Sequence, residues 1–305
     1  MTTRDGFHTT TAGLRAESFP MRLYQKAKRL GVWDPAEIDF GRDRQDWLEM
    51  DEERREAILS LTSLFVAGEE AVTLDLLPLL MTVAREGRLE EELYLTTFLW
   101  EEGKHAEFFS RFLVDVADSP QDLARFHVPS YLTIFQEELP AAMNRLLDDP
   151  SPEALARAAV TYNMIVEGVL AETGYHSYHA SLARNDLMPG LCSGLVHVKR
   201  DESRHIAYGV YLLSRLVAAD PAIWDVIEQR MNELFPYTIA MIDETFADYE
   251  DGVTPFGLEQ GEFVDFATSQ FGKRYERISK ARGKTLAELD AEPEPEDVTD
   301  LEAAL

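Results

Sequence analysis

One arrangement of metal-binding residue types occurs twice in this chain and constrains its fold more than any other feature. A glutamate is followed, 33 or 35 residues later, by a second glutamate and a histidine in the spacing Glu-x-x-His. The two copies consist of Glu69, Glu102 and His105, and of Glu167, Glu202 and His205. Residues three apart share one face of a helix, so each Glu-x-x-His can reach a single metal ion. Four antiparallel helices that carry these six side chains would form a bundle around two metal ions.

The motif alone is weak, and its surroundings carry the argument. With 33 glutamates and 7 histidines in 305 residues, about 0.8 Glu-x-x-His pairs would arise at random. The helix faces around the six residues are mostly apolar; Glu69, for example, shares its face with Phe65 and Leu76. Buried charges must be paired or bound to metal, so this pattern predicts a metal centre rather than a structural polar network. Carboxylate and imidazole donors without thiolate favour iron and manganese and argue against a structural zinc site.

The charge and the cysteine count exclude several classes of function. The chain has 56 acidic and 29 basic residues and a formal net charge of −27, which repels nucleic acid and anionic lipid surfaces. No run of 18 apolar residues is present, so we expect neither a nucleic-acid partner nor stable membrane insertion. The single cysteine, Cys192, cannot form an internal disulfide and, with a polar N-terminus, indicates the cytoplasm.

The hydrophobic periodicity predicts an all-α fold with a four-helix bundle core and additional helices. The core helices are expected at residues 51–85, 89–116, 153–184 and 189–218, and further helices at 19–30, 131–147, 221–249 and 262–281. Ser151 and Pro152 form an N-cap and first-turn signal for the third core helix. The predicted organisation is a flexible N-terminus at 1–19, one domain at 20–288 and a disordered acidic tail at 289–305.

Residues next to the six proposed ligands have predicted supporting roles. The carboxylate of Asp201 can accept the free ring N–H of a metal-bound histidine and fix its orientation. Arg204 can pair with Asp201 at three residues' spacing, and an ordinary helix ion pair is the alternative reading of both. Glu70 and Glu101 turn about 100° away from the ligand faces, so we expect them to be solvated or salt-bridged.

Three further histidines lack a matching upstream glutamate and are expected to be structural or surface residues. They are His176, His179 and His197. Glu172 and His176 stand four residues apart and form the one competing ligand pair.

Several segments resemble the ferritin-like dimetal carboxylate superfamily. They are 33–40 (WDPAEIDF), 66–73 (VAGEEAVT), 101–105 (EEGKH), 161–168 (TYNMIVEG) and 201–205 (DESRH). The first resembles ribonucleotide reductase small subunits. The others look like the ligand-binding oxidases that are paralogues of those subunits, and the likeness runs from about Trp33 to Gly283. It implies a ferritin-like bundle for the domain.

The resemblance also implies a cofactor, a ligand and a reaction. The cofactor would be one manganese and one iron ion, with two iron ions as the alternative, assembled with dioxygen. The ligand would be a long-chain fatty acid with its carboxylate at the metals. An ether cross-link would join Val72 to Tyr162, and Tyr175 would be a phenol near the site. Val72 lies on the metal-facing side of its helix, but Tyr162 lies about 140° from Glu167 on an ideal α-helix, so periodicity alone would not select it.

We therefore expect a cytoplasmic homodimeric oxidase that performs a two-electron oxidation of an unactivated C–H bond. A ribonucleotide reductase small subunit is the first alternative, but many of these carry a radical tyrosine where this chain has Phe109. Some manganese–iron reductases share that phenylalanine. The last tyrosine is Tyr275, so the tail has none for radical transfer, and the first ligand is Glu69, where most reductases have aspartate. A ferritin-type storage protein is the second alternative, and the chain is long for one.

Overall fold

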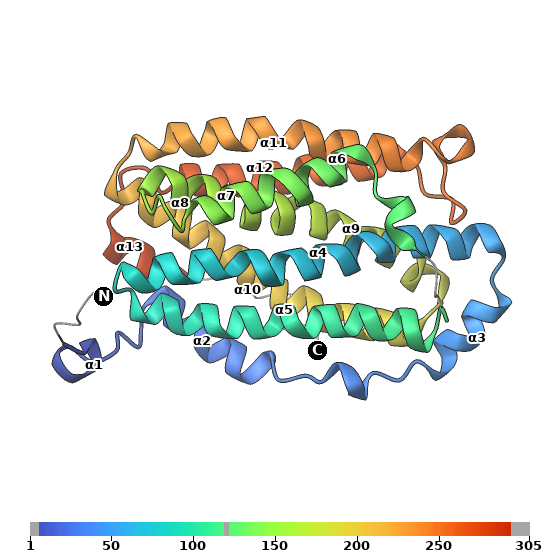
Figure 1. Ribbon diagram of the computed structural model, residues 1–305, viewed down its shortest axis with the longest axis horizontal. Helices are drawn as coiled ribbons and strands as arrows, with labels where there is room; N and C mark the ends of the chain where they lie inside the picture. The colour runs from blue at the N-terminus through green and yellow to red at the C-terminus, as the bar shows by residue number, and fades with distance from the viewer. Residues whose placement is uncertain (1–5, 119–121, 294–305) are drawn as a thin grey trace.

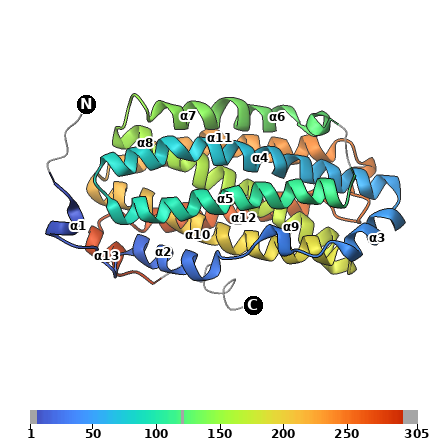
Figure 2. The ribbon, with the colours of Figure 1, turned by 60° about the horizontal axis from the view of Figure 1, so that its bottom comes forward.

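The four-helix bundle core is present in the computed structural model, which describes residues 6–118 and 122–293. Within these ranges the chain is helical, and its one β feature is an isolated bridge between Val253 and Glu259. The core helices are α4 (Glu52–Arg85), α5 (Leu89–Asp115), α10 (Pro189–Ala219) and a continuous helical run at 152–181. They lie side by side along the long axis of the molecule (Figures 1 and 2).

Further helices cover the outer faces of this core. Helix α2 (Phe19–Leu30) packs on α5, and α7 (Leu139–Arg145), which follows α6 (Pro129–Leu132) and the π-helix η3 (Thr133–Glu138), packs on α4. Helices α11 (Ile223–Phe246) and α12 (Gln260–Ser279) cover the helical run at 152–181. The side chains that these layers enclose are buried and largely apolar, which is the environment predicted for the six ligands.

The helical run at 152–181 contains a long π-helix. It consists of α8 (Pro152–Ala159), the π-helix η4 (Val160–Ala171) and α9 (Glu172–Ser181). Ser151 caps it as predicted, because its hydroxyl accepts the N–H of Ala154 at 3.3 Å. By length and composition alone the stretch Pro152–Asn185 could cross a membrane, but 89% of its apolar window is buried inside the bundle. Its apolar character is therefore that of a core helix.

Helix α3 (Gly41–Glu49) was not predicted from the sequence, and it caps another helix. Asp43 is fully buried and accepts the backbone N–H groups of Gly190 at 2.8 Å and Leu191 at 2.7 Å, at the start of α10. A carboxylate at a helix N-terminus satisfies donors that have no partner within the helix. Helix α3 thus fixes the start of the helix that carries Glu202 and His205.

The predicted boundaries at the two ends of the chain need correction. Phe19 is buried at the start of α2, and the backbone N–H of Arg15 binds Glu90 at 2.9 Å, so packed structure begins before residue 20. Leu289, the first residue of the predicted tail, is buried in α13 (Leu286–Asp290). A capping box between Thr285 and Glu288 starts this helix. Residues 1–5 and 294–305 of the predicted flexible ends lie outside the described residues.

Replacing Asp75 with asparagine is expected to stabilise the fold at neutral and alkaline pH. Asp75 is 6% exposed and has no hydrogen-bond or ion-pair partner among the described residues, and burial raises the pKa of its carboxyl to about 6. A raised pKa means that the folded state favours the protonated form, so stability falls as the pH rises from about 4 towards 6. Removing the charge should raise the free energy of unfolding by about 1–3 kcal/mol at pH 8, and by less at pH 5.

Urea unfolding of the wild type and of Asp75→Asn at pH 8 and pH 5 measures the change in the free energy of unfolding at each pH. Asp43→Asn is the matched control, because Asp43 is also buried but binds two N–H groups, and its replacement should destabilise the chain. If Asp75→Asn raised the free energy of unfolding by the same amount at the two pH values, the destabilisation could not come from the charge of Asp75.

Candidate metal centre

The structure brings all six predicted ligands together in the middle of the bundle. They form two overlapping groups in which the ligand atoms lie within 4.8 Å of one another. The groups are Glu69, Glu102, His105 and Glu202, and Glu102, Glu167, Glu202 and His205. Glu102 and Glu202 belong to both groups and would be shared between two metal ions, whereas Glu69 and Glu167 would each hold one. All six side chains are at most 5% exposed.

Both histidine rings present Nδ1 to the carboxylates. His105 Nδ1 lies 3.3 Å from Glu202 Oε1 and 3.5 Å from Glu102 Oε2. His205 Nδ1 lies 3.3 Å from Glu102 Oε1 and 3.4 Å from Glu202 Oε2. Ligands about 2.1 Å from an octahedral ion and at right angles to each other are about 3 Å apart, so this spacing suits metal coordination.

The electrostatics of the centre also favour bound cations. Burial raises the pKa of Glu69 to about 8, although the His105 ring partly offsets it, and burial raises the pKa of Glu167 as well. Burial acts on Glu102 in the same sense, but the two histidine rings beside its carboxylate outweigh burial and lower the pKa of Glu102. Without metal, such a cluster must bind protons to limit its charge. Divalent cations can replace those protons.

A second, independent observation supports the fit of these residues to a pair of metal ions. Five buried ligand atoms have no hydrogen-bond partner among the described residues: Glu102 Oε2, His105 Nδ1, Glu167 Oε1, Glu202 Oε2 and His205 Nδ1. Buried polar atoms are nearly always satisfied, so five unpaired atoms that face one space call for a partner. Carboxylate oxygens and imidazole nitrogens are donors that iron and manganese accept.

On the side of each histidine ring that faces away from the ligand groups, a carboxylate lies within hydrogen-bond distance of Nε2. Asp201 Oδ2 is 3.4 Å from His105 Nε2, where it can accept the ring N–H, and Arg204 forms an ion pair with Asp201. Glu101 Oε2 is 3.0 Å from His205 Nε2, and Glu101 Oε1 accepts from Arg204 at 2.7 Å. The sequence predicted that Glu101 is either solvated or salt-bridged. It is salt-bridged to Arg204 and fully buried. Helices α2 and α10 cover this side of α5, so the face that turns away from the metals is also dry.

Tyr162 and Val72 meet at the edge of the centre. The phenol of Tyr162 lies 3.2 Å from the main-chain oxygen of Val72 and 3.3 Å from Glu102 Oε1. The 140° separation expected between Tyr162 and Glu167 does not hold, because both lie in the π-helix. Residues five apart in a π-helix are joined by the i→i+5 hydrogen bond and stand nearly one above the other.

Other predicted neighbours are placed as follows. The phenol of Tyr175 lies 3.4 Å from Glu202 Oε1, beside the centre as the resemblance implied. His176 binds Glu262 at 2.8 Å, and His197 stacks on Trp33. Neither of these histidines, nor the exposed His179, belongs to a ligand group, and Glu172 does not either. Glu70 is exposed, as expected.

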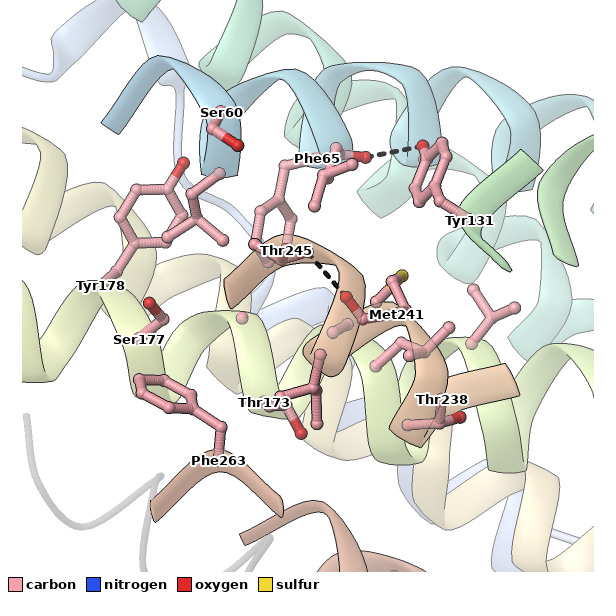
Figure 3. A pocket seen from close by; sticks show the side chains of 18 of the residues that line it. Ser60, Phe65, Tyr131, Thr173, Ser177, Tyr178, Thr238, Met241, Thr245 and Phe263 are labelled. Carbon is pink, nitrogen blue, oxygen red and sulfur yellow. Dashed lines mark hydrogen bonds between the residues drawn. The ribbon is translucent and has the colours of Figure 1, made fainter. Parts of the chain in front are cut away.

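A largely apolar cavity leads away from the centre between α4, α9, α11 and α12 (Figure 3). It holds about 1260 Å³ of space between its lining atoms, part of it open to solvent. Its inner end includes the glutamates of both groups and Val72, and along α4 it reaches Ala57. That is a length of roughly 22 Å at 1.5 Å per residue. No lysine, arginine or histidine lies among its described lining residues, so an anion inside it would have only the metals as positively charged partners.

The chain matches the family "Ribonucleotide reductase, small chain" over residues 21–278. Three similar structures are variants of an R2-like ligand-binding oxidase, and each is covered over 100% of its length. A Y162F variant with aerobically reconstituted Mn/Fe cofactor is 42% identical over 91% of this chain, with a TM-score of 0.86. An E69D variant with Mn/Fe cofactor and a G68L variant with Fe/Fe cofactor are each 40% identical over 92% of the chain, with TM-scores of 0.88.

These likenesses extend over nearly the whole described chain and agree with the geometry of the centre. The residues substituted in those relatives have the same type and number as Tyr162, Glu69 and Gly68 of this chain, all of which lie at or beside the centre. The chain therefore belongs to the ribonucleotide reductase small chain family and, within it, to the R2-like ligand-binding oxidases, enzymes with a carboxylate–histidine site for two metal ions.

Proposed function

We propose that this oxidase holds one manganese and one iron ion and uses dioxygen to form an ether between Tyr162 and Val72. Two iron ions are the alternative, because one relative is described with an Fe/Fe cofactor. When bound, the metal pair supplies two of the four electrons that reduce dioxygen to water, together with the oxidising power for C–H cleavage. The observation that carries the proposal is the contact of the Tyr162 phenol with the main-chain oxygen of Val72 and with Glu102.

The ether step is balanced by the groups present and by dioxygen. The phenol oxygen of Tyr162 bonds to Cβ of Val72, and the O–H and Cβ–H hydrogens leave as two protons and two electrons. Burial, and then the surrounding carboxylates, raise the pKa of Tyr162, so the phenol holds its proton at neutral pH. The carboxylate of Glu102 lies 3.3 Å from the phenol oxygen, within reach of that proton.

The cavity supports a long-chain fatty acid as the ligand. Its walls are largely apolar, and each buried methylene group contributes about 0.8 kcal/mol to binding. Since the described lining has no basic side chain, the metals at the inner end would be the positively charged partner for a carboxylate head group. This orientation would place the first carbons of the chain next to Val72 and Glu69.

Mass spectrometry tests both parts of the proposal. After loading with manganese and iron in air, the intact protein should lose the mass of two hydrogens, and the loss should map to peptides that contain Val72 and Tyr162. Denaturation in organic solvent should release about one fatty acid per chain. Protein loaded without dioxygen should show no mass loss. A mass loss that also occurs without dioxygen would exclude the proposed reaction.

We also propose that the chain acts as a homodimer in the cytoplasm. The outer face of α4 carries three exposed apolar side chains at helical spacing: Leu74, Leu77 and Met81. Leu74 is 67% exposed, and apolar stripes of this kind are typical of protein contacts. Light scattering should give about twice the chain mass of 34.6 kDa. The Leu74→Glu variant should shift towards the monomer, whereas Glu70→Ala, on the same helix, should not. A wild-type monomer would contradict this assignment.

A further inference from the structure

A line of buried charged groups connects the two histidines on the side that faces away from the metals. His105 Nε2 lies 3.4 Å from Asp201, and His205 Nε2 lies 3.0 Å from Glu101. The guanidinium of Arg204 stands between these carboxylates and binds both. All five side chains have an exposed fraction of 0%. The two metal positions are therefore supported by one continuous network without access to solvent.

The two halves of this network differ. Asp201 Oδ2 is shared between Trp33 Nε1 at 2.7 Å, Lys104 Nζ at 3.0 Å and His105 at 3.4 Å. Glu101 Oε2, in contrast, binds only His205 among the described residues, at 3.0 Å. The usual donor–acceptor distance of an N–H···O hydrogen bond is about 2.7–3.2 Å. Among the described residues, Glu101 is therefore the one hydrogen-bond partner of His205 Nε2, whose ring also stacks on Phe98, while His105 Nε2 has a shared and more distant acceptor.

Glu101 is also held in place from two sides. Arg204 binds Glu101 Oε1 at 2.7 Å from α10, and Gly31 at the end of α2 lies directly against the same carboxylate. A Cβ atom at Gly31 would stand 2.2 Å from Glu101 Oε1, which real structures do not tolerate. The close approach of the two helices thus leaves the carboxylate little room to turn away from His205.

We propose that Glu101 is the positioning residue of the metal position that His205 and Glu167 form. By accepting the Nε2–H of His205 it fixes the tautomer in which Nδ1 is free to bind a metal. Arg204 holds Glu101 in place without touching a ligand itself. Loss of Glu101 should therefore weaken one metal position and spare the other.

Metal retention tests this inference, which rests on the dimetal site. Loss of a carboxylate that orients a metal-bound histidine lowers metal affinity by about 10–100-fold. In Glu101→Gln we expect that loss at the His205 position alone, so the chain should hold about one metal at a chelator concentration at which the wild type holds two. Element analysis after dialysis against graded chelator gives the affinities. Anomalous diffraction at the metal absorption edges shows which position is empty.

Glu91→Gln is the matched control for the loss of a buried carboxylate. Glu91 is on the same helix, is 1% exposed and binds Arg215 at 3.1 Å, about 15 Å along α5 from Glu101. It should lower stability but retain both metals. Glu101→Asp keeps the charge beside Arg204 but is one methylene too short to reach the ring. It should fold and lose the same metal, even if Glu101→Gln does not fold.

The possible outcomes separate this inference from the site itself. Equal loss at both positions in the Glu101 variants, or unchanged affinity, would overturn the positioning role. Loss of metal from Glu91→Gln to the same degree would also overturn it, because the effect would then be general. If the wild-type chain held fewer than two metal ions, the assignment of a two-metal site would itself be contradicted, and the inference about Glu101 would fail with it.

Discussion

Replacing Glu102 with alanine is expected to empty both metal positions, so that the metal content falls from two ions per chain to well below one. Glu102 is shared by the two ligand groups, and its two oxygens lie 3.5 Å and 3.3 Å from Nδ1 of His105 and His205. The change thus removes a ligand from each position at once. Element analysis of the purified protein after dialysis measures the result.

Comparison with other variants makes this prediction specific. His205→Ala removes a ligand from one group only, so its metal content should fall from two to about one. Glu107→Ala changes an exposed glutamate on the same helix and should leave two ions per chain. If Glu102→Ala retained two ions, the bridging role of Glu102 would be excluded, and with it the arrangement of the centre.

The sequence was sufficient to predict which six side chains meet inside the bundle, because the face of a helix on which a side chain lies follows from spacing alone. Each Glu-x-x-His occupies one helix face, and a ligand glutamate on an apolar face must point inwards. The start of the third core helix was predictable for a similar reason, since Ser151 and Pro152 act locally. These features depend on contacts within one or two helical turns.

The features that spacing did not predict depend on how the helices pack. Tyr162 reaches the centre because 160–171 is a π-helix, and the 3.6-residue period of an α-helix places it wrongly. Glu101 is buried because α2 closes over α5 at Gly31, a contact between residues 70 positions apart. A glycine where the helix ends, followed by the buried Trp33, was the available signal for a close approach.

Helix α13 was missed for a different reason, because composition alone predicted disorder where the chain is partly helical. The segment is acidic and is followed by a stretch that contains proline, and this composition is typical of a disordered tail. The capping box of Thr285 and Glu288 was nevertheless visible, and the burial of Leu289 holds the segment against the bundle. Asp290 also accepts from Tyr211 at 2.9 Å. Composition over a long window therefore concealed a short helix that a few tertiary contacts stabilise.

The cross-link should disappear completely in Tyr162→Phe, while the metal content stays at two ions per chain. The variant removes the phenol oxygen that the ether requires, and none of the ligand atoms changes. A relative with the Y162F substitution is described with an aerobically reconstituted Mn/Fe cofactor, which supports retention of the metals. Intact-mass measurement after loading in air should then show the full mass of the chain, without the loss of two hydrogens expected for the wild type.

Tyr175→Phe is the matched control, because Tyr175 is an equally buried phenol at the same centre, 3.4 Å from Glu202. It should keep the mass loss, since its oxygen does not contact Val72 in the structure. Val72→Ala should lose the cross-link as well, because it replaces the tertiary Cβ–H by the stronger C–H bond of a methyl group. Mass loss that persists in Tyr162→Phe, or that disappears in Tyr175→Phe, would place the oxidised phenol elsewhere. The contact with Val72 would then be only a packing contact of a buried tyrosine.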